Sequence, residues 1–175
     1  MQKIMSSVKQ KKTSVLPLAM GGVMAALVCL ATLVFKLPVP VTQGYIHLGD
    51  ALVLVSAAVL GPTGIAAAAV GSMLADLLGG YFTYLIPTLL IKGMVAMVAY
   101  LGLGKQRPFW VQLLVLMAAE GVMVLGYFLA ECLLYGAAAA AGAVLPNVVQ
   151  GVGGAVFGML LIPVFRRIVA GLKGR

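Results

Sequence analysis

Few residues of this chain are able to do chemistry, and they lie inside or beside strongly apolar segments. The sequence holds four carboxylates, one histidine and twelve Lys or Arg residues among 175 positions. A single histidine excludes a two-histidine zinc site, and neither a G-x-S-x-G motif nor a phosphate-binding glycine loop is present. Ser72, His47 and Asp76 have the types of a catalytic triad, but nothing in their spacing supports one. The inventory therefore favours ligand binding over catalysis, and any ATP would have to be used by a partner.

The composition predicts that these residues are held by membrane-spanning helices. The chain is 63% hydrophobic and 9% charged, with a mean hydropathy of +1.14, which predicts an all-α polytopic membrane protein. We expect one membrane domain over 1–175: a basic N-terminus at 1–14, a six-helix bundle at 15–166 and a basic tail at 167–175. The six apolar runs are 16–35, 48–60, 64–79, 81–103, 109–135 and 143–165.

The second and third runs are shorter than the ~20 residues of a straight span. The Gly61-Pro62-Thr63-Gly64 sequence between them is typical of a turn. We therefore expect two short or tilted helices here. The first run exceeds the ~7–15 apolar residues of a secretory signal, so we expect it to be a helix of the bundle.

The cations predict the orientation of the bundle. Four precede the first run, two lie between the fourth and fifth, and four follow the sixth: Lys3, Lys9, Lys11, Lys12, Lys105, Arg107, Arg166, Arg167, Lys173 and Arg175. If both termini are cytoplasmic, these ten lie inside, as the positive-inside rule requires. The net charge of +8 then reflects orientation in a lipid bilayer, and nucleic-acid binding needs no consideration.

With this topology, every carboxylate, the histidine and Lys92 fall in the outer half of the membrane or near its midplane. A charge near the bilayer centre costs roughly 2.5–3.5 kcal/mol even on the lenient insertion scale. These groups should therefore face the bundle interior, and together they predict a polar pocket that opens to the outside. The alternative is that Lys92 pairs with Glu120 or Asp76 and only holds helices together.

The segment 36–49, "KLPVPVTQGYIHLG", differs from the helical runs. Pro38 and Pro40 exclude a helix, and Gln43, Tyr45 and His47 supply hydrogen-bonding side chains. We expect an extended outer loop that is able to cover the pocket, with an ordinary connector as the alternative.

Small residues recur at helical spacing in three of the runs, and in the sixth the pair is Gly154/Gly158. In the third run they share a row with Asp76, which predicts a central helix with Asp76 facing inward; the row is Gly64, Ala68, Ser72, Asp76 and Gly80. In the first run the pairs are Gly21/Ala25 and Gly22/Ala26. Spacing alone favours packing within the chain for these pairs over docking of another subunit.

Several segments carry a family likeness when taken in order: "MGGVMAAL", the P-V-P loop leading to "YIHLGDALV", "LGPTGIAAAAVGSMLADLLGGY", "PTLLIKGMVAMVAY" and "LPNVVQGVGGAVFG". Over nearly its whole length the chain resembles the substrate-binding S components of energy-coupling factor (ECF) vitamin transporters. The likeness is greatest to the riboflavin-type and pyrimidine- or pyridoxine-precursor branch.

This resemblance implies a protein of the prokaryotic plasma membrane without enzyme activity or cofactor, which binds a vitamin or precursor near the outer face. It implies assembly with a transmembrane coupling subunit and two cytoplasmic ATPase subunits. It also favours docking for the small residues of the first helix, although the usual Ala-xxx-Ala is Gly-xxx-Ala here. The docking candidates are Gly21, Gly22, Ala25 and Ala26.

The resemblance places the substrate pocket at the outer loop and the last three helices. Tyr45 and Tyr84 could stack on a flat ring, Asn147 and Gln150 could pair with ring nitrogens and carbonyls, and Lys92 could meet a phosphate or phenolate. The pocket candidates are Gln43, Tyr45, His47, Tyr84, Lys92, Glu120, Glu131, Asn147 and Gln150.

Two other functions remain open. A six-helix scaffold subunit of a cell-wall elongation assembly would have similar hydropathy and length, but little reason to collect carboxylates, a lysine and an Asn/Gln pair on the outer side. A stand-alone ion-coupled carrier would be supported by matching broken helices in inverted halves, and the sequence contains none.

Overall fold

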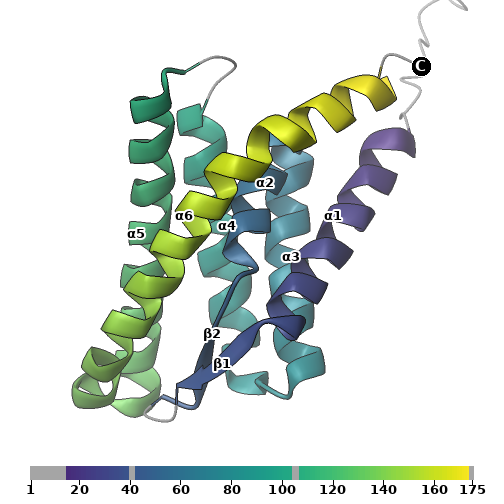
Figure 1. The fold of residues 1–175 in the computed structure, drawn as a ribbon. Coiled ribbons are helices and arrows are strands. Elements are labelled where there is room, and N and C mark those ends of the chain that lie inside the picture. Colours follow the sequence, from purple (N-terminus) through teal and green to yellow (C-terminus); the bar gives the residue numbers. More distant parts are fainter. Residues whose placement is uncertain (1–14, 40–41, 104–106, 174–175) are drawn as a thin grey trace, which may run out of the picture.

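The computed structural model describes residues 15–39, 42–103 and 107–173 of the chain (Figure 1). Within these ranges it contains six α-helices, a two-stranded hairpin and a short 3₁₀ helix. The elements, in chain order, are α1 (Val15–Val34), β1 (Lys36–Val39), β2 (Gly44–His47), α2 (Asp50–Leu60), α3 (Pro62–Gly79), η1 (Phe82–Tyr84), α4 (Leu85–Leu103), α5 (Phe109–Tyr135) and α6 (Ala137–Lys173).

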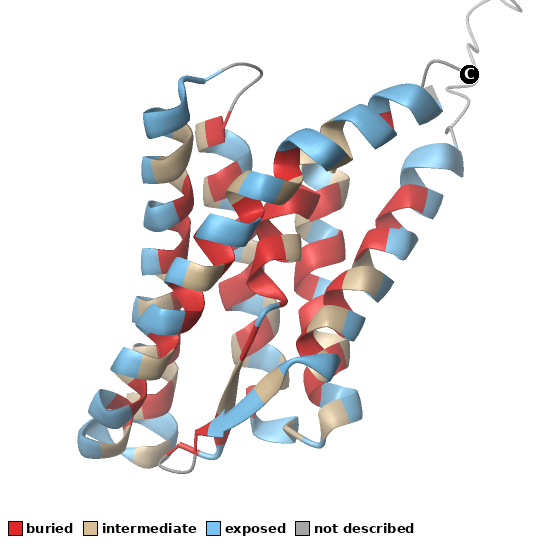
Figure 2. Cartoon of the chain, in the orientation of Figure 1, coloured by how far each residue is buried: buried red, intermediate tan, exposed pale blue. Residues whose placement is uncertain are grey.

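Five of the six helices are long and apolar enough to cross a bilayer, counting η1 with α4. The exception is α2, whose 11 residues extend only about 16 Å. The surface of the bundle is correspondingly apolar: Leu18, Trp110 and Leu133 are 76%, 70% and 90% exposed. Figure 2 shows exposed residues on the outward sides of the helices and buried ones between them. This pattern suits lipid as the surrounding solvent and confirms the predicted multi-pass helical bundle.

Gly61 separates α2 from α3, as the turn signal predicted. Its φ of +60° lies where glycine is favoured, and Pro62 follows at the first position of α3. Gly64 then lets the two helices touch, because a Cβ at this position would overlap the carbonyl oxygen of Ser56.

The central position of α3 is confirmed, since it packs against α1, α2 and α4. Asp76 is buried on this helix, as predicted. Gly71 allows the closest approach to α1, because a Cβ there would lie 2.5 Å from the carbonyl oxygen of Ala25. Gly21 faces the same helix: its Cβ would lie 2.7 Å from Thr63 Cγ2. One small row of α1 is thus used for packing within the chain.

The other small row of α1 points away from the bundle. Gly22 and Ala26 are exposed, and a Cβ on Gly22 would meet no atom within 4 Å. The two rows were not distinguishable by spacing, and the structure separates them by their neighbours.

The last helix is longer than the sequence predicted. It begins at Ala137, directly after Gly136 with its φ of +87°, and continues to Lys173, whereas we expected 143–165. Pro146 and Pro163 lie inside the helix without ending it. Five alanines at 137–141 favour the early start, and most of the predicted basic tail at 167–175 is therefore helical.

The segment between α1 and α2 is extended, as predicted, but its strands also pair. β1 and β2 are antiparallel, with Lys36 opposite His47 and Val39 opposite Gly44. In Figure 1 this hairpin lies at the end of the bundle where α5 meets α6. We call this the hairpin end. The opposite end, where α1 begins and α6 finishes, is the termini end.

Candidate functional site

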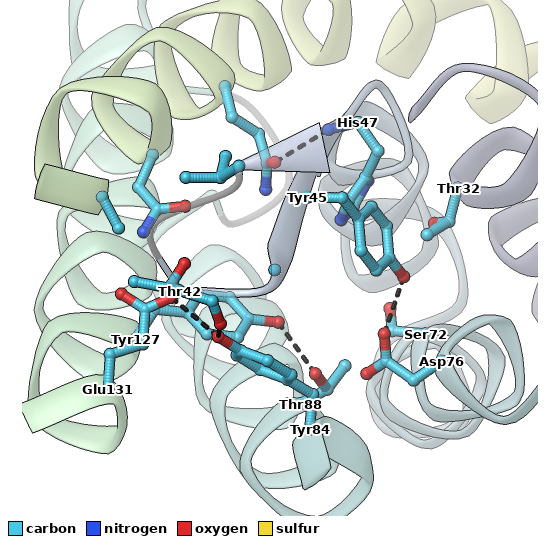
Figure 3. A pocket seen from close by; sticks show the side chains of 15 residues that line it. Thr32, Thr42, Tyr45, His47, Ser72, Asp76, Tyr84, Thr88, Tyr127 and Glu131 are labelled. Carbon is cyan, nitrogen blue, oxygen red and sulfur yellow. Dashed lines mark hydrogen bonds between the residues drawn. The ribbon is translucent and has the colours of Figure 1, made fainter. Parts of the chain in front are cut away.

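A small polar cavity lies beneath the hairpin and is lined by α1, both strands, α3, α4, α5 and α6 (Figure 3). Its volume is about 20 Å³, which is room for about one water molecule. The lining residues are Thr32, Val39, Thr42, Gly44, Tyr45, His47, Ser72, Asp76, Tyr84, Thr88, Tyr127, Glu131, Ala143, Asn147 and Gln150.

Six of the nine pocket candidates from the sequence line this cavity: Tyr45, His47, Tyr84, Glu131, Asn147 and Gln150. The other three do not. Gln43 is exposed at the turn of the hairpin, with a φ of +53°, while Lys92 and Glu120 are buried elsewhere between helices. The polar lining residues absent from that set are Thr32, Thr42, Ser72, Asp76, Thr88 and Tyr127. Ser72 and Asp76 lie four residues apart in the row of small residues on α3, and this spacing could have indicated that both face the cavity.

Hydrogen bonds between elements hold the walls of the cavity. The Tyr45 hydroxyl donates to Asp76 Oδ1 over 2.7 Å, which ties β2 to α3. The Tyr84 hydroxyl lies 2.8 Å from the Thr42 carbonyl oxygen and 3.1 Å from Glu131 Oε1. Burial and the neighbouring Asp76 raise the pKa of Tyr45, so its phenol keeps the proton that it donates. The hairpin is thereby fastened over the cavity at several points.

The cavity also gathers hydrogen-bonding capacity that the chain does not use. Seven buried side-chain atoms have no hydrogen-bond partner among the described residues, and five of them belong to cavity residues. These five are Thr32 Oγ1, Thr42 Oγ1, Ser72 Oγ, Asp76 Oδ2 and Glu131 Oε2. Two of the carboxylates have a hydroxyl nearby but outside hydrogen-bond geometry: Thr42 beside Glu131 and Thr88 beside Asp76. Since buried polar atoms are normally paired, this concentration of unpaired atoms leaves room for hydrogen bonds to a water molecule or a ligand.

Lys92 forms an ion pair with a residue that the sequence analysis did not consider as its partner. The sequence left Glu120 and Asp76 open, but the structure pairs Lys92 Nζ with Asp50 Oδ1, and both side chains are fully buried. Gln150 Nε2 donates to Asp50 Oδ2 over 2.6 Å, and Gln150 Oε1 accepts from the His47 backbone N–H over 2.8 Å. This network joins α4, α2, α6 and β2, which indicates a structural role for Lys92.

Glu120 lies in a separate place, between α5 and α6. It is 2% exposed, and neither carboxylate oxygen has a hydrogen-bond partner among the described residues. Its side chain packs against Gly151 and Gly154, where added Cβ atoms would lie 3.0 Å from Glu120 Cβ and Oε1 respectively. Glu120 lines an apolar groove on the outside of the bundle and not the cavity beneath the hairpin.

His47 is held as a neutral hydrogen-bond acceptor at the base of β2. Its Nδ1 accepts the Gly49 N–H over 2.9 Å, so the ring proton belongs on Nε2. Burial lowers the pKa of His47 to about 4. Gly49 makes this contact possible, because a Cβ there would overlap the Thr32 hydroxyl.

We expect His47 to make the stability of the chain depend on pH. Between pH 6.5 and 4 the unfolded chain binds a proton at His47 that the folded chain does not. Stability should therefore be greatest above pH 6.5 and fall by up to about 3 kcal/mol as the pH drops to 4. Melting temperatures of the detergent-solubilised chain across this range measure the effect.

The matched control is His47→Asn, whose side-chain oxygen is able to accept the Gly49 N–H in an Asx-turn but does not titrate. Its melting temperature should fall less steeply towards pH 4 than that of the wild type. Parallel curves for the two proteins would show that His47 does not titrate in this window.

Comparison with known proteins identifies the family of this chain. A family model described as "ECF-type riboflavin transporter, S component" matches residues 12–167. The chain belongs to this family. The S component assignment confirms the resemblance seen in the sequence, and it makes the chain a substrate-binding subunit for transport without catalysis of its own.

Two further comparisons found proteins that are similar to this S component in sequence or in fold. A protein of Pyrococcus woesei, described as "Uncharacterized protein in gap 3'region", is 34% identical over 133 residues, which cover 75% of this chain and 88% of the relative. A solved S component of a bacterial ECF transporter superimposes with a TM-score of 0.66 at 22% identity, over 90% of this chain and 97% of that one. The second likeness shows that the fold is shared.

Proposed function

We propose that this S component binds a water-soluble vitamin or vitamin precursor in the cavity beneath the hairpin. Riboflavin, hydroxymethylpyrimidine and pyridoxine-like compounds are the candidates. The observation that carries the proposal is the group of five unpartnered polar atoms around one cavity. The aromatic rings of Tyr45, Tyr84 and Tyr127 supply surfaces for a flat ring beside them.

Binding requires the cavity to enlarge. Its volume of about 20 Å³ is far below the ~300 Å³ or more of typical small-molecule sites. The hairpin covers the cavity: among the described residues its strands pair with each other and with no other strand, and hydrogen bonds to the side chains of Asp76, Tyr84 and Gln150 fasten it to the helices. Outward movement of the hairpin would release these bonds and admit the ligand.

The distribution of cations supports an orientation with the cavity facing outward. Arg107 precedes α5, and Arg166 and Arg167 lie in the last turns of α6, so all three are near the termini end. By the positive-inside rule this end is cytoplasmic, in the plasma membrane of a prokaryote. The hairpin end and its cavity then face the outside, where a nutrient would arrive.

The outward row of α1 is the docking surface that we propose for a transmembrane coupling subunit, which would act with two cytoplasmic ATPase subunits. Gly22 and Ala26 are exposed and have small side chains that allow another helix to approach closely. Gly21 and Ala25, which were docking candidates from the sequence, pack against α3 instead.

The binding proposal is tested by a thermal-shift screen of the detergent-purified chain against water-soluble vitamins and their precursors. A ligand at 1,000 times its dissociation constant should stabilise the chain by about 4 kcal/mol, a clear rise in melting temperature. Calorimetry on the hit should then give a nanomolar dissociation constant. A folded chain that responds to none of the panel would contradict vitamin binding and favour a ligand outside the vitamin class.

A further inference from the structure

Lys36 is a cation that the orientation of the bundle does not explain. Of the Lys and Arg residues that the structure describes, it alone lies in the hairpin, at the end that the proposed orientation places outside the cell. The positive-inside rule favours cations at the opposite end. Lys92 is paired with Asp50, whereas Lys36 has no ion pair with a described residue. The position of Lys36 therefore has another physical reason.

The ammonium group of Lys36 lies over two tyrosine rings. Lys36 Nζ is 5.6 Å from the centroid of the Tyr45 ring and 5.2 Å from that of the Tyr81 ring, and the two centroids are 4.4 Å apart. All three residues are half-buried. A cation within about 6 Å of a ring face is attracted to it, more strongly where water is partly excluded. The three side chains therefore form one cation–π cluster.

One of these rings belongs to the end of α3. Tyr81 follows Gly80, whose φ of +82° ends the helix, and the Tyr81 N–H donates to the Asp76 carbonyl oxygen over 2.8 Å. Gly79 leaves room for the cluster, because a Cβ there would lie 3.2 Å from Lys36 Nζ and 3.1 Å from the Tyr81 ring. Lys36 thus lies beside the C-terminal turn of α3, where the helix dipole also favours a cation.

This cluster ties the strand that is otherwise held only through its partner. The hydrogen bonds between the hairpin and the helices involve β2 and the turn, at Tyr45, His47 and Thr42 (Figure 3). Among the described residues, β1 makes no hydrogen bond to a helix and pairs with β2. Val39 of β1 lines the cavity, whereas Lys36 does not. The contact of Lys36 with Tyr81 therefore fastens this side of the cover.

We infer that Lys36 is a clamp: it holds β1 against the end of α3 and sets the rates at which a compound enters and leaves the cavity, without contacting that compound. The inference rests on the proposed function and adds a positioning residue to it. A compound must pass the hairpin in both directions, and the clamp lies outside the lining, so an empty and a filled cavity need the same opening. Loss of the clamp should therefore speed association and dissociation by similar factors.

The test measures both rates for Lys36→Met and Lys36→Arg, on the full chain in detergent. The probes are radiolabelled riboflavin, hydroxymethylpyrimidine and pyridoxine, and the rates are taken for whichever compound binds. In Lys36→Met both rates should rise at least about 5-fold, the factor that a partly shielded cation–π contact is worth, while the dissociation constant stays within about 2-fold of the wild type. Lys36→Arg keeps a cation over the rings and should retain the wild-type rates.

A second pair of variants separates the clamp from a general effect of changing the hairpin. Tyr81→Leu removes the ring at the end of α3, outside the cavity lining, and should also speed both rates. Its combination with Lys36→Met should add little, because each single change already removes the same contact. Leu37→Met is the matched control: Leu37 is 66% exposed and points to the opposite face of β1, so the rates should not change.

The outcomes separate this inference from the function on which it rests. Wild-type rates in both Lys36→Met and Tyr81→Leu would overturn the clamp and leave vitamin binding intact. Faster dissociation of Lys36→Met with an unchanged association rate would also overturn it, because Lys36 would then contact the compound itself. A folded chain that binds none of the three probes would overturn vitamin binding and the inference with it.

Discussion

The variant Lys92→Met is expected to lose about 3–5 kcal/mol of stability, because it leaves Asp50 buried with no counter-charge. Asp50→Asn should cost a similar amount by leaving the Lys92 ammonium alone, even though the asparagine oxygen is able to accept the Gln150 amide. A loss of this size should remove most of the folded chain from detergent extracts. The yield and melting temperature of each purified variant measure it.

The double variant Lys92→Met with Asp50→Asn distinguishes an ion pair from two independent polar sites. It should recover much of the stability, because neither charge is then left unpaired in the membrane. Losses that simply add in the double variant would contradict the pairing. A Lys92→Met protein that kept wild-type stability but lost ligand binding would show that Lys92 contacts the ligand and does not only hold the helices together.

The second large effect is expected at the exposed row of α1. Ala26→Trp should leave ligand affinity and melting temperature unchanged, because Ala26 points away from the bundle. It should abolish uptake and co-purification with the coupling subunit, since a tryptophan prevents the close helix approach that a small residue permits. Uptake in cells that express the complete transporter, together with binding by the purified variant, measures the two effects separately.

Ala118→Trp is the matched control. Ala118 is exposed on α5, which begins at the same end of the bundle as α1, so this variant places the same bulk in the membrane on another face. It should retain uptake. Normal complex formation by Ala26→Trp, or equal loss in both variants, would contradict docking at this row.

Hydropathy predicted the helices well because each apolar run needs lipid or protein around it, and Gly61 with Pro62 marked the α2–α3 break correctly. It missed both ends of α6, which begins at Ala137 and continues to Lys173, beyond the apolar run at 143–165. It also could not show that β1 and β2 pair, because the register of a hairpin depends on contacts between strands and not on the local pattern alone.

The candidate site was predictable only in part, for a related reason. Polar residues in apolar runs are costly, so Glu131, Asn147 and Gln150 were visible as inward-facing groups. Which groups meet depends on the rotation of each helix against its neighbours. The rotation of the helices pairs Lys92 with Asp50 and turns Gly21 inward and Gly22 outward. It also places Thr32 and Thr88 in the wall of the cavity.

The central claim is that the substrate occupies the cavity beneath the hairpin, and one calorimetric comparison tests it most directly. Ala143 is 2% exposed and lines the cavity, whereas Ala141 is exposed on the same helix. Binding of the best compound from the vitamin screen would be measured for the wild type, Ala143→Leu and Ala141→Leu. We predict that Ala143→Leu binds at least about 10-fold more weakly, because its side chain fills ligand space, and that Ala141→Leu matches the wild type. Equal affinity in all three proteins would place the substrate elsewhere and contradict the account.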